Sequence, residues 1–262
     1  MADKNKNILE RISETIFWKS IFRTGIPRNR RQRMMSVLNN VFLHLHPVRL
    51  PKHAVKIKYT WCMGGLSFFL FLVLTITGIL LMFYYRPTVE YAYTDMIDLG
   101  EQVPLGIMRE IHRWGAHAMV LSVWLHMFRV FMTGSYKPPR EFNWVIGVML
   151  LFMTLFLSFT GYLLPWDQLA IWAVTVGTNM ARAHPFIGHE GPGANLLAIG
   201  DINLVHAGSD IRFALLGGRF VGEATLLRFY VLHCIGVPFI AVILMAVHFW
   251  RVRKDGGISG PI

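Results

Sequence analysis

Long apolar stretches separated by polar connections are the dominant pattern of this chain. A stretch of about 20 apolar residues is long enough to cross the hydrocarbon core of a bilayer as a helix. Four stretches reach this length with interiors almost free of charge, at about residues 59–84, 112–133, 143–164 and 229–250. The pattern therefore predicts an all-α membrane protein with four transmembrane helices.

These stretches divide the chain into three parts. Residues 59–254 form the predicted helical domain, in which the connection 165–228 joins the third and fourth helices, and residues 255–262 form a short tail. Residues 1–58 form an arm with apolar side chains at helical spacing among Lys and Arg: Ile8, Leu9, Ile12, Ile16, Phe17 and Ile21. This spacing predicts an amphipathic helix on the membrane surface, with a disordered basic tail as the alternative.

The net charge of +11 is distributed unevenly along the chain. Residues 1–58 hold 13 Lys and Arg against three acidic residues, whereas the connection 86–111 is rich in Asp and Glu. Because the number of predicted spans is even, both termini lie on one side, and the positive-inside rule makes that side cytoplasmic. Topology and contact with membrane lipid explain the basic charge, so we expect no nucleic-acid binding.

Two pairs of histidines lie within the apolar stretches. His112 and His126 are 14 residues apart in the second stretch, and His233 and His248 are 15 apart in the fourth. At 1.5 Å per residue, each pair spans roughly 21–22 Å along a helix and returns to about the same face. The second and fourth helices run in the same direction, so His112 pairs with His233 on the outer side and His126 with His248 on the inner side.

Two imidazoles at each of two depths predict a di-haem bundle. A lone histidine in an apolar helix is usually a polar packing residue, but four at matched depths favour axial ligation of two b haems. Such ligation fills both axial positions, so the iron transfers electrons without binding oxygen. A single zinc site is disfavoured because the four imidazoles are too far apart to meet. His117 lies off the ligand face, and we interpret it as a packing or hydrogen-bonding residue.

Glycines and arginines accompany the histidines. Gly64 and Gly78 in the first stretch, and Gly147 and Gly161 in the third, are again 14 residues apart. A macrocycle lying against a helix needs positions without a side chain, although ordinary small-residue helix packing is the alternative. Haem propionates need cations, and the candidates are Arg109, Arg113, Arg129 and Arg228. For Arg129, anchoring the helix at the membrane interface is as well supported as pairing with a propionate.

The segments His112-Arg113-Trp114 to Arg129 and Gly161-Tyr-Leu-Leu-Pro-Trp-Asp-Gln168, together with His233 and His248, resemble the cytochrome b family of quinol-oxidising complexes. The 15-residue spacing and the ending at residues 257–262 resemble the short, split b6 form. The resemblance covers about residue 55 to the C-terminus. The N-terminal arm and the connection after Gln168 are longer than is usual for that form. Because of these departures, the resemblance does not specify the quinone species or the accessory subunits.

The resemblance implies a role in electron transport. An outer quinol pocket would be lined partly by Pro165, Trp166 and Asp167, and electrons would pass through the outer and inner haems to an inner quinone site. This path would be coupled to proton translocation. Arg253 is the one candidate for the inner site, with helix anchoring as its alternative. Helix capping is the alternative for Asp167.

The resemblance also implies partners and a third haem. The partners are a three-span subunit that completes cytochrome b, a Rieske iron–sulfur protein and a c-type cytochrome or equivalent acceptor, in a dimeric complex. The expected location is a bacterial cytoplasmic membrane in preference to a thylakoid. Cys62, in the pattern Cys62-Met-Gly-Gly, would form one thioether to a haem c, whereas a buried thiol is the alternative. Cys234 is interpreted as structural.

Two other classes of function compete with this interpretation. A di-haem membrane anchor of a dehydrogenase would also have a four-helix core, but would not be expected to combine the Pro-Trp-Asp-Gln segment, the paired glycines and the Cys62 pattern. A transporter or structural membrane protein without redox activity would give no reason for histidines at matched depths. A reduced-minus-oxidised spectrum separates the last class from the first two.

Overall fold

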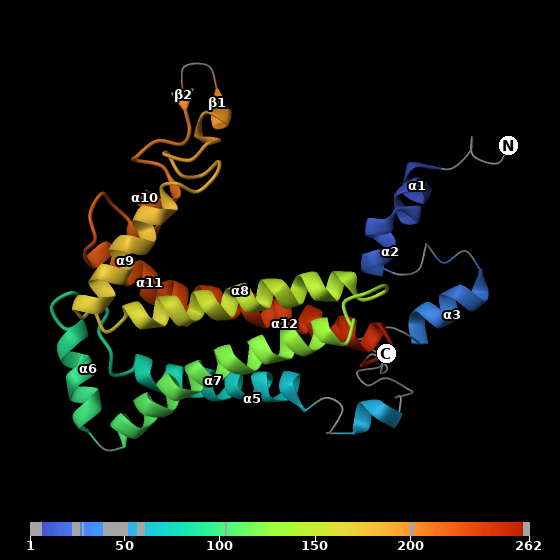
Figure 1. The fold of residues 1–262 in the computed structure, drawn as a ribbon, viewed down its shortest axis with the longest axis horizontal. Coiled ribbons are helices and arrows are strands. Elements are labelled where there is room, and N and C mark those ends of the chain that lie inside the picture. The colour runs from blue at the N-terminus through green and yellow to red at the C-terminus, as the bar shows by residue number, and fades with distance from the viewer. Residues whose placement is uncertain are drawn as a thin grey trace. The chain divides into compact units, whose positions relative to one another are not determined.

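The structure is a computed structural model, and it describes residues 7–22, 27, 29–38, 52–56, 61–102, 104–199 and 202–258. Among these residues, four helical segments are long and apolar enough to cross a membrane, as the sequence predicts. They are α5 (Met63–Met82), α7 (Leu105–Met132), α8 (Glu141–Leu163) and Glu223–Lys254 (Figure 1). The last is built from α11 (Glu223–Val231), the π-helix η3 (Leu232–Gly236) and α12 (Val237–Lys254).

The helices differ in extent from the apolar stretches that predict them. The second begins at Leu105 instead of residue 112, and the fourth at Glu223 instead of residue 229. Both added segments carry charged side chains, namely Arg109 and Glu110 in α7 and Glu223 and Arg228 in α11. Hydropathy locates only the apolar part of a helix, because a helix continues through polar turns for as long as its backbone hydrogen bonds are made.

The connections contain secondary structure of their own. They hold α6 (Ala92–Glu101), α9 (Gln168–Ala181), η2 (Ala194–Leu197) and α10 (Ile211–Leu216). Two short strands, β1 (Ala198–Ile199) and β2 (Ile202–Asn203), pair antiparallel with Ala198 opposite Asn203. In the arm lie α1 (Ile8–Glu14), α2 (Ile16–Phe22), α3 (Arg30–Leu38) and η1 (Lys52–Val55). Within the described ranges, the fold is therefore helical apart from one ribbon of two short strands.

The chain forms two compact units. The terminal unit comprises Met1–Ser67, Leu121–Phe152 and Ala241–Ile262, and the loop unit comprises Phe68–Val120 and Met153–Ile240. The helices α5, α7, α8 and α12 contribute to both units. Each unit contains one of the predicted histidine pairs, so each candidate haem site can be described within its own unit.

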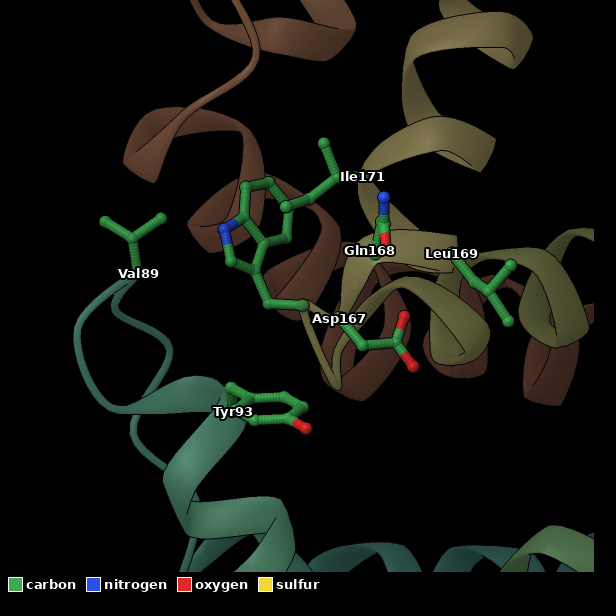
Figure 2. A pocket seen from close by; sticks show the side chains of 7 residues that line it. Val89, Tyr93, Asp167, Gln168, Leu169 and Ile171 are labelled. Carbon is green, nitrogen blue, oxygen red and sulfur yellow. The ribbon is translucent and has the colours of Figure 1, made fainter.

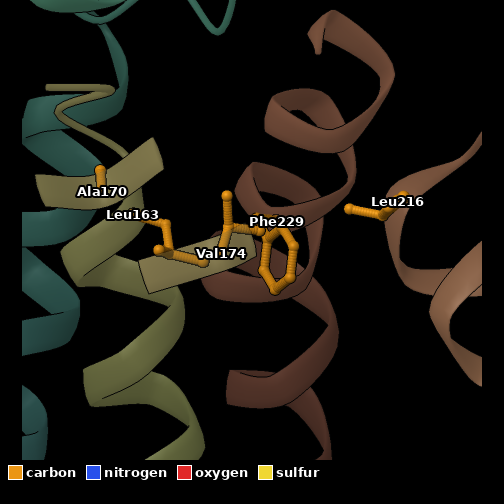
Figure 3. Close-up of a cluster of buried hydrophobic side chains, with 5 residues drawn as sticks. All are labelled: Leu163, Ala170, Val174, Leu216 and Phe229. Carbon is orange, nitrogen blue, oxygen red and sulfur yellow. The ribbon is translucent and has the colours of Figure 1, made fainter. Parts of the chain in front are cut away.

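The loop unit has two apolar clusters. Leu163, Ala170, Val174, Leu216 and Phe229 pack together where α8, α9, α10 and α11 meet (Figure 3). Tyr85, Ala92, Trp166 and Leu226 form the second cluster. Helices α9 and α10 each begin after an aspartate whose side chain caps the helix. Asp167 accepts a hydrogen bond from the N–H of Ala170, and Asp210 accepts one from the N–H of Phe213. These caps and clusters hold α9 and α10 against α8 and α11.

The terminal unit joins the arm to the end of the fourth helical segment. The side chain of Arg251 is fully buried, donates to the carbonyls of Ile21 in α2 and Pro139, and pairs with Asp255 at 3.3 Å. The arm forms two short helices, α1 and α2, which Thr15 separates, and apolar side chains such as Ile16 and Phe17 are exposed there. Its place on the membrane surface stays a prediction, as do the parts of the arm and of the tail outside the described residues.

Candidate functional site

The loop unit brings His112 and His233 together. His112 lies on α7 and His233 on η3, and their ring centres are 6.3 Å apart with the ring planes at 77°. Both side chains are half-buried. The structure thus forms the pair that the direction of the helices predicts for one of the two haems.

The terminal unit brings His126 and His248 together in nearly the same geometry. His126 lies on α7 and His248 on α12, with ring centres 6.4 Å apart and ring planes at 81°. Both are again half-buried. The repetition of one arrangement in two separate units indicates that the pairs serve the same purpose.

The separation within each pair fits two imidazoles on one metal ion. A metal–imidazole bond is about 2.0–2.1 Å, and the nitrogen lies about 1.2 Å from its ring centre, so two such rings on opposite sides of a metal are at most about 6.5 Å apart. The observed 6.3 and 6.4 Å agree with this value. In the part of the chain that the structure describes, no group of three or more His, Cys, Asp or Glu is arranged to hold a metal. Each pair supplies two ligands, and a planar macrocycle would supply the others.

Each histidine ring lies against one of the four predicted glycines. A Cβ atom at Gly161 would lie 2.6 Å from Cε1 of His233, and one at Gly78 would lie 3.1 Å from Cε1 of His112. In the terminal unit, the corresponding distances are 3.3 Å from Gly64 to His126 and 3.7 Å from Gly147 to His248. The glycines therefore make room for the histidine rings themselves.

The π-helix η3 explains the unequal spacing of the histidines. In η3 the N–H of Val237 bonds the carbonyl of Leu232, five residues earlier, so this turn holds one residue more than an α-turn. Pro238 follows directly and has no N–H to give to an α-helical bond. A segment of 15 residues that includes one such turn covers the same rotation as 14 α-helical residues, the spacing of His112 and His126 in α7.

The predicted propionate cations have different surroundings. Arg113 pairs with Glu110 on the same helix at 2.5 Å, and Arg109 lies 3.6 Å from Glu110. Arg228 donates to the carbonyl of Ala214 in α10. Arg129 is half-buried three residues from His126. A propionate would have to share or replace these protein contacts of Arg109, Arg113 and Arg228.

A pocket of about 680 Å³ in the loop unit includes two of the three predicted quinol-site residues. Trp166 and Asp167 line it together with Val89, Tyr93, Gln168, Leu169 and Ile171, whereas Pro165 is not a lining residue. Figure 2 shows Val89 and Tyr93 reaching it from the side of α6 and the other labelled residues from the start of α9. Its volume lies in the usual range for small-molecule sites, and four of its seven lining residues, Tyr93, Trp166, Asp167 and Gln168, carry a polar group.

The segment at this pocket is held in an uncommon conformation. Trp166 is buried and has φ of 51°, a left-handed value that is costly for a bulky residue. The next residue, Asp167, has one oxygen committed to the cap of α9, at 2.8 Å from the nitrogen of Ala170. Helix capping, one of the two roles that the sequence left open for Asp167, is therefore confirmed.

Cys62 lies directly before α5 in the terminal unit. Its side chain is exposed, and its Sγ atom would be 2.8 Å from a Cβ at Gly65. Trp61 and Cys62 both adopt positive φ values, 53° and 51°. Two successive left-handed residues form a tight turn directly before α5, and Gly65, which has no side chain, leaves space beside the thiol. Cys234, in contrast, is half-buried in η3.

Several contacts near the sites were not predicted. Asp95 of α6 accepts from the side chain of Arg86 at 2.5 Å and from its backbone N–H at 2.8 Å. The hydrogen bond from Arg86 holds the pKa of Asp95 below its ordinary value of 3.8, and the same bond raises the pKa of Arg86. In the long connection, Asp210 is buried and pairs with His189. Burial of Asp210 opposes its ionisation, but hydrogen bonds from Phe213 and His189 leave its pKa lowered.

Comparisons with known proteins point to a single family. The family model described as cytochrome b/b6/petB matches residues 49–191 and 201–256. Cytochrome b6 of Auxenochlorella protothecoides is 44% identical over 214 residues, which are 81% of this chain and 88% of that protein. Cytochrome b6 of Heliomicrobium gestii is 39% identical over 218 residues, 83% of this chain and 91% of that one.

Among solved structures, a chain of a hyperthermophilic respiratory Complex III has the same fold. The TM-score is 0.64 and the sequence identity is 27%. The match covers 97% of this chain but 56% of that chain, so the present chain spans little more than half of that protein's length.

Proposed function

Because the chain belongs to the cytochrome b/b6 family, we propose that it is the cytochrome b subunit of a b6f/bc-type complex. As a member of this family, it is an integral membrane electron-transfer subunit of a multi-subunit redox complex, and the family implies b-type haems. In our proposal, electrons from quinol oxidised on the outer side cross the membrane through two b haems to an inner quinone site. Proton translocation is coupled to this transfer.

The two histidine pairs carry this proposal. Ring centres at 6.3 and 6.4 Å, each ring facing a glycine, suit axial ligation of one haem by His112 and His233 and of another by His126 and His248. Haem, when bound, would supply a one-electron redox couple, and the two imidazoles of each pair would hold its iron. The chain contributes the fixed separation of the ligand rings and an apolar surrounding. Arg109, Arg113, Arg129 and Arg228 are the proposed propionate partners.

The pocket at Trp166 and Asp167 is the proposed place for quinol. An apolar wall formed by Val89, Leu169 and Ile171 suits a quinone ring, and the Tyr93 hydroxyl and Asp167 carboxylate can bond its oxygens. One oxygen of Asp167 caps α9, which leaves the second available for a proton. On the inner side, we propose Arg253 for the quinone: its Nε atom is buried, and no hydrogen-bond partner for it occurs in the described structure.

The exposed thiol of Cys62 is the proposed attachment point of a haem c. Its S–H would add across one vinyl group of the haem and form a single thioether. The left-handed turn at Trp61 and Cys62 supports this by presenting the sulfur at the start of α5.

The proposed partners are the three-span subunit, the Rieske protein and a c-type cytochrome or equivalent acceptor, in a dimer. We place the complex in a bacterial cytoplasmic membrane with both termini on the cytoplasmic side.

Single-ligand variants of the purified complex test the proposal. We expect His112→Ala or His233→Ala to remove one b-type absorbance and to leave the other, and His126→Ala or His248→Ala to do the reverse. His117→Ala, on the same helix as two of the ligands, is the matched control and should retain both. Co-purification of a Rieske protein is expected for this proposal and not for a dehydrogenase anchor. Retention of both absorbances in any ligand variant would contradict it.

A further inference from the structure

Two threonine hydroxyls contact the ligand rings of the loop unit. Thr77 Oγ1 lies 2.9 Å from Nδ1 of His112, and Thr160 Oγ1 lies 3.1 Å from Nδ1 of His233. Each threonine directly precedes a glycine that faces the same ring, Gly78 or Gly161. Both hydroxyls are buried with their residues. The same Thr-Gly pair thus supports both ligands of one candidate haem, from α5 on one side and α8 on the other.

The single proton of each hydroxyl already has an acceptor. Thr77 donates to the carbonyl of Val73 at 2.8 Å, and Thr160 donates to that of Phe156 at 2.9 Å. Because a hydroxyl has one proton and two lone pairs, its remaining bond to the imidazole must be an acceptor bond. Nδ1 of each ring is therefore the protonated nitrogen. Nε2 is left with the lone pair that a metal requires.

We propose that Thr77 and Thr160 are positioning residues that fix the tautomer and the electron density of the two imidazoles in the loop unit. The inference rests on the proposed function, since it concerns ligands of a haem that the family implies. Donation from Nδ1–H to an oxygen makes Nε2 a stronger electron donor, which stabilises the oxidised form of a bound iron. The hydroxyls should therefore lower the midpoint potential of that haem.

The terminal unit has no equivalent hydroxyls at these positions. The residues before Gly64 and Gly147 are Met63, whose thioether is only a weak hydrogen-bond acceptor, and Ile146, which has no acceptor in its side chain. The two candidate haem sites share the spacing of their rings but differ in this contact. The chain thus has a means of giving the two haems different potentials, and the effect of Thr77 and Thr160 should be confined to one of them.

Thr77→Val and Thr160→Val, made separately in the full complex, test this proposal. Valine keeps the shape of threonine and removes the hydroxyl. We expect the midpoint potential of one b haem to rise, so that its reduced-to-oxidised ratio at a fixed ambient potential increases roughly two- to tenfold. The other haem should not change, and Thr77→Ser and Thr160→Ser should restore the wild-type potential. Thr75→Val is the matched control, because Thr75 makes the same kind of helix bond, to Phe71, on α5.

The possible results separate this inference from the proposed function. Absence of b-type absorbance in the wild type would contradict both. Two intact haems with unchanged potentials in the valine variants would contradict the inference and leave the proposed function standing. The rings of His112 and His233 also interact with the backbone of Leu74 and Leu157, and this result would mean that the backbone alone holds the rings. A shift in both haems, or an equal shift in Thr75→Val, would also overturn it. Loss of one haem in the valine variants, with retention in the serine variants, would support it.

Discussion

Gly161 faces His233 so closely that a Cβ at this glycine would lie 2.6 Å from Cε1 of the ring. Atoms at that distance overlap, so one of them must move, and the ring belongs to a proposed haem ligand. The absence of a side chain at Gly161 therefore leaves the space that the His233 ring occupies in the loop unit.

We expect substitution of the four glycines by alanine to lower haem content in the order of these distances. Gly161→Ala should lose most of one b haem, Gly78→Ala at 3.1 Å and Gly64→Ala at 3.3 Å should lose part, and Gly147→Ala at 3.7 Å should lose little. Haem b per chain, measured as the pyridine haemochrome, checks this order. Gly100→Ala is the control, because nothing lies within 4 Å of its added Cβ. Equal losses at all four positions would contradict the steric explanation.

The π turn at η3 predicts that the fourth helical segment tolerates the deletion of one residue better than the insertion of one. Deleting Ile235, whose side chain is exposed, would reduce the spacing of His233 and His248 from 15 positions to 14, the spacing of His112 and His126 in α7. Because the ring of Pro238 would clash in a regular α-helix, the deletion is combined with Pro238→Ala. We expect this variant to retain both b-type absorbances. Inserting one alanine after Ile240 should remove at least one of them, because it rotates His248 by about 100°. Loss of haem in the deletion variant would show that the extra residue has another purpose.

Asp167→Asn and Asp167→Ala separate capping from proton transfer. Asparagine caps a helix about as well as aspartate, whereas alanine costs about 1 kcal/mol of stability. If the second carboxylate oxygen accepts a proton from quinol, both variants should oxidise quinol at least about tenfold more slowly. Only Asp167→Ala should lower the thermal unfolding midpoint. If Asp167→Asn oxidises quinol at the wild-type rate, the role of Asp167 is limited to capping α9.

Cys62→Ala should remove chain-bound haem and nothing else. A denaturing gel stained for haem peroxidase activity is expected to show a band for the wild-type chain and none for the variant, since b haems dissociate on denaturation. The b-type absorbances of the native complex should persist in both. Cys234→Ala provides the control and should keep the band. A wild-type chain without a stained band would disprove the thioether.

The Arg86–Asp95 pair predicts a stability that depends on pH. The folded pKa of Asp95 is lowered, so its contribution is complete above the ordinary value of 3.8 and is lost as the pH falls through the lower folded value. Wild type should therefore unfold at a higher temperature than Asp95→Asn near neutral pH, and the difference should shrink in strongly acidic buffer. Glu101→Gln, an exposed site on the same helix, serves as the control. A difference that persists at low pH would assign the effect to packing.

The sequence by itself determined the class of fold and the two histidine pairs. Long apolar stretches can satisfy their backbone in a membrane only as helices, and the direction of alternating helices decides which histidines can meet. The spacing of the glycines was also visible in the sequence, because helical periodicity links positions 14 residues apart. The Thr-Gly pairs at residues 77–78 and 160–161 offered a similar signal.

Only the tertiary structure decided how each site is held. The contacts of Thr77 and Thr160 with the ligand rings join residues 35 and 73 positions apart, and the bond from Arg251 to Ile21 joins residues 230 apart. The π turn at η3, the left-handed Trp166 and the pocket beside it likewise depend on packing against neighbouring helices. Helical periodicity predicts which face of a helix a residue occupies. It does not predict which atoms of a neighbouring helix are in contact with that face.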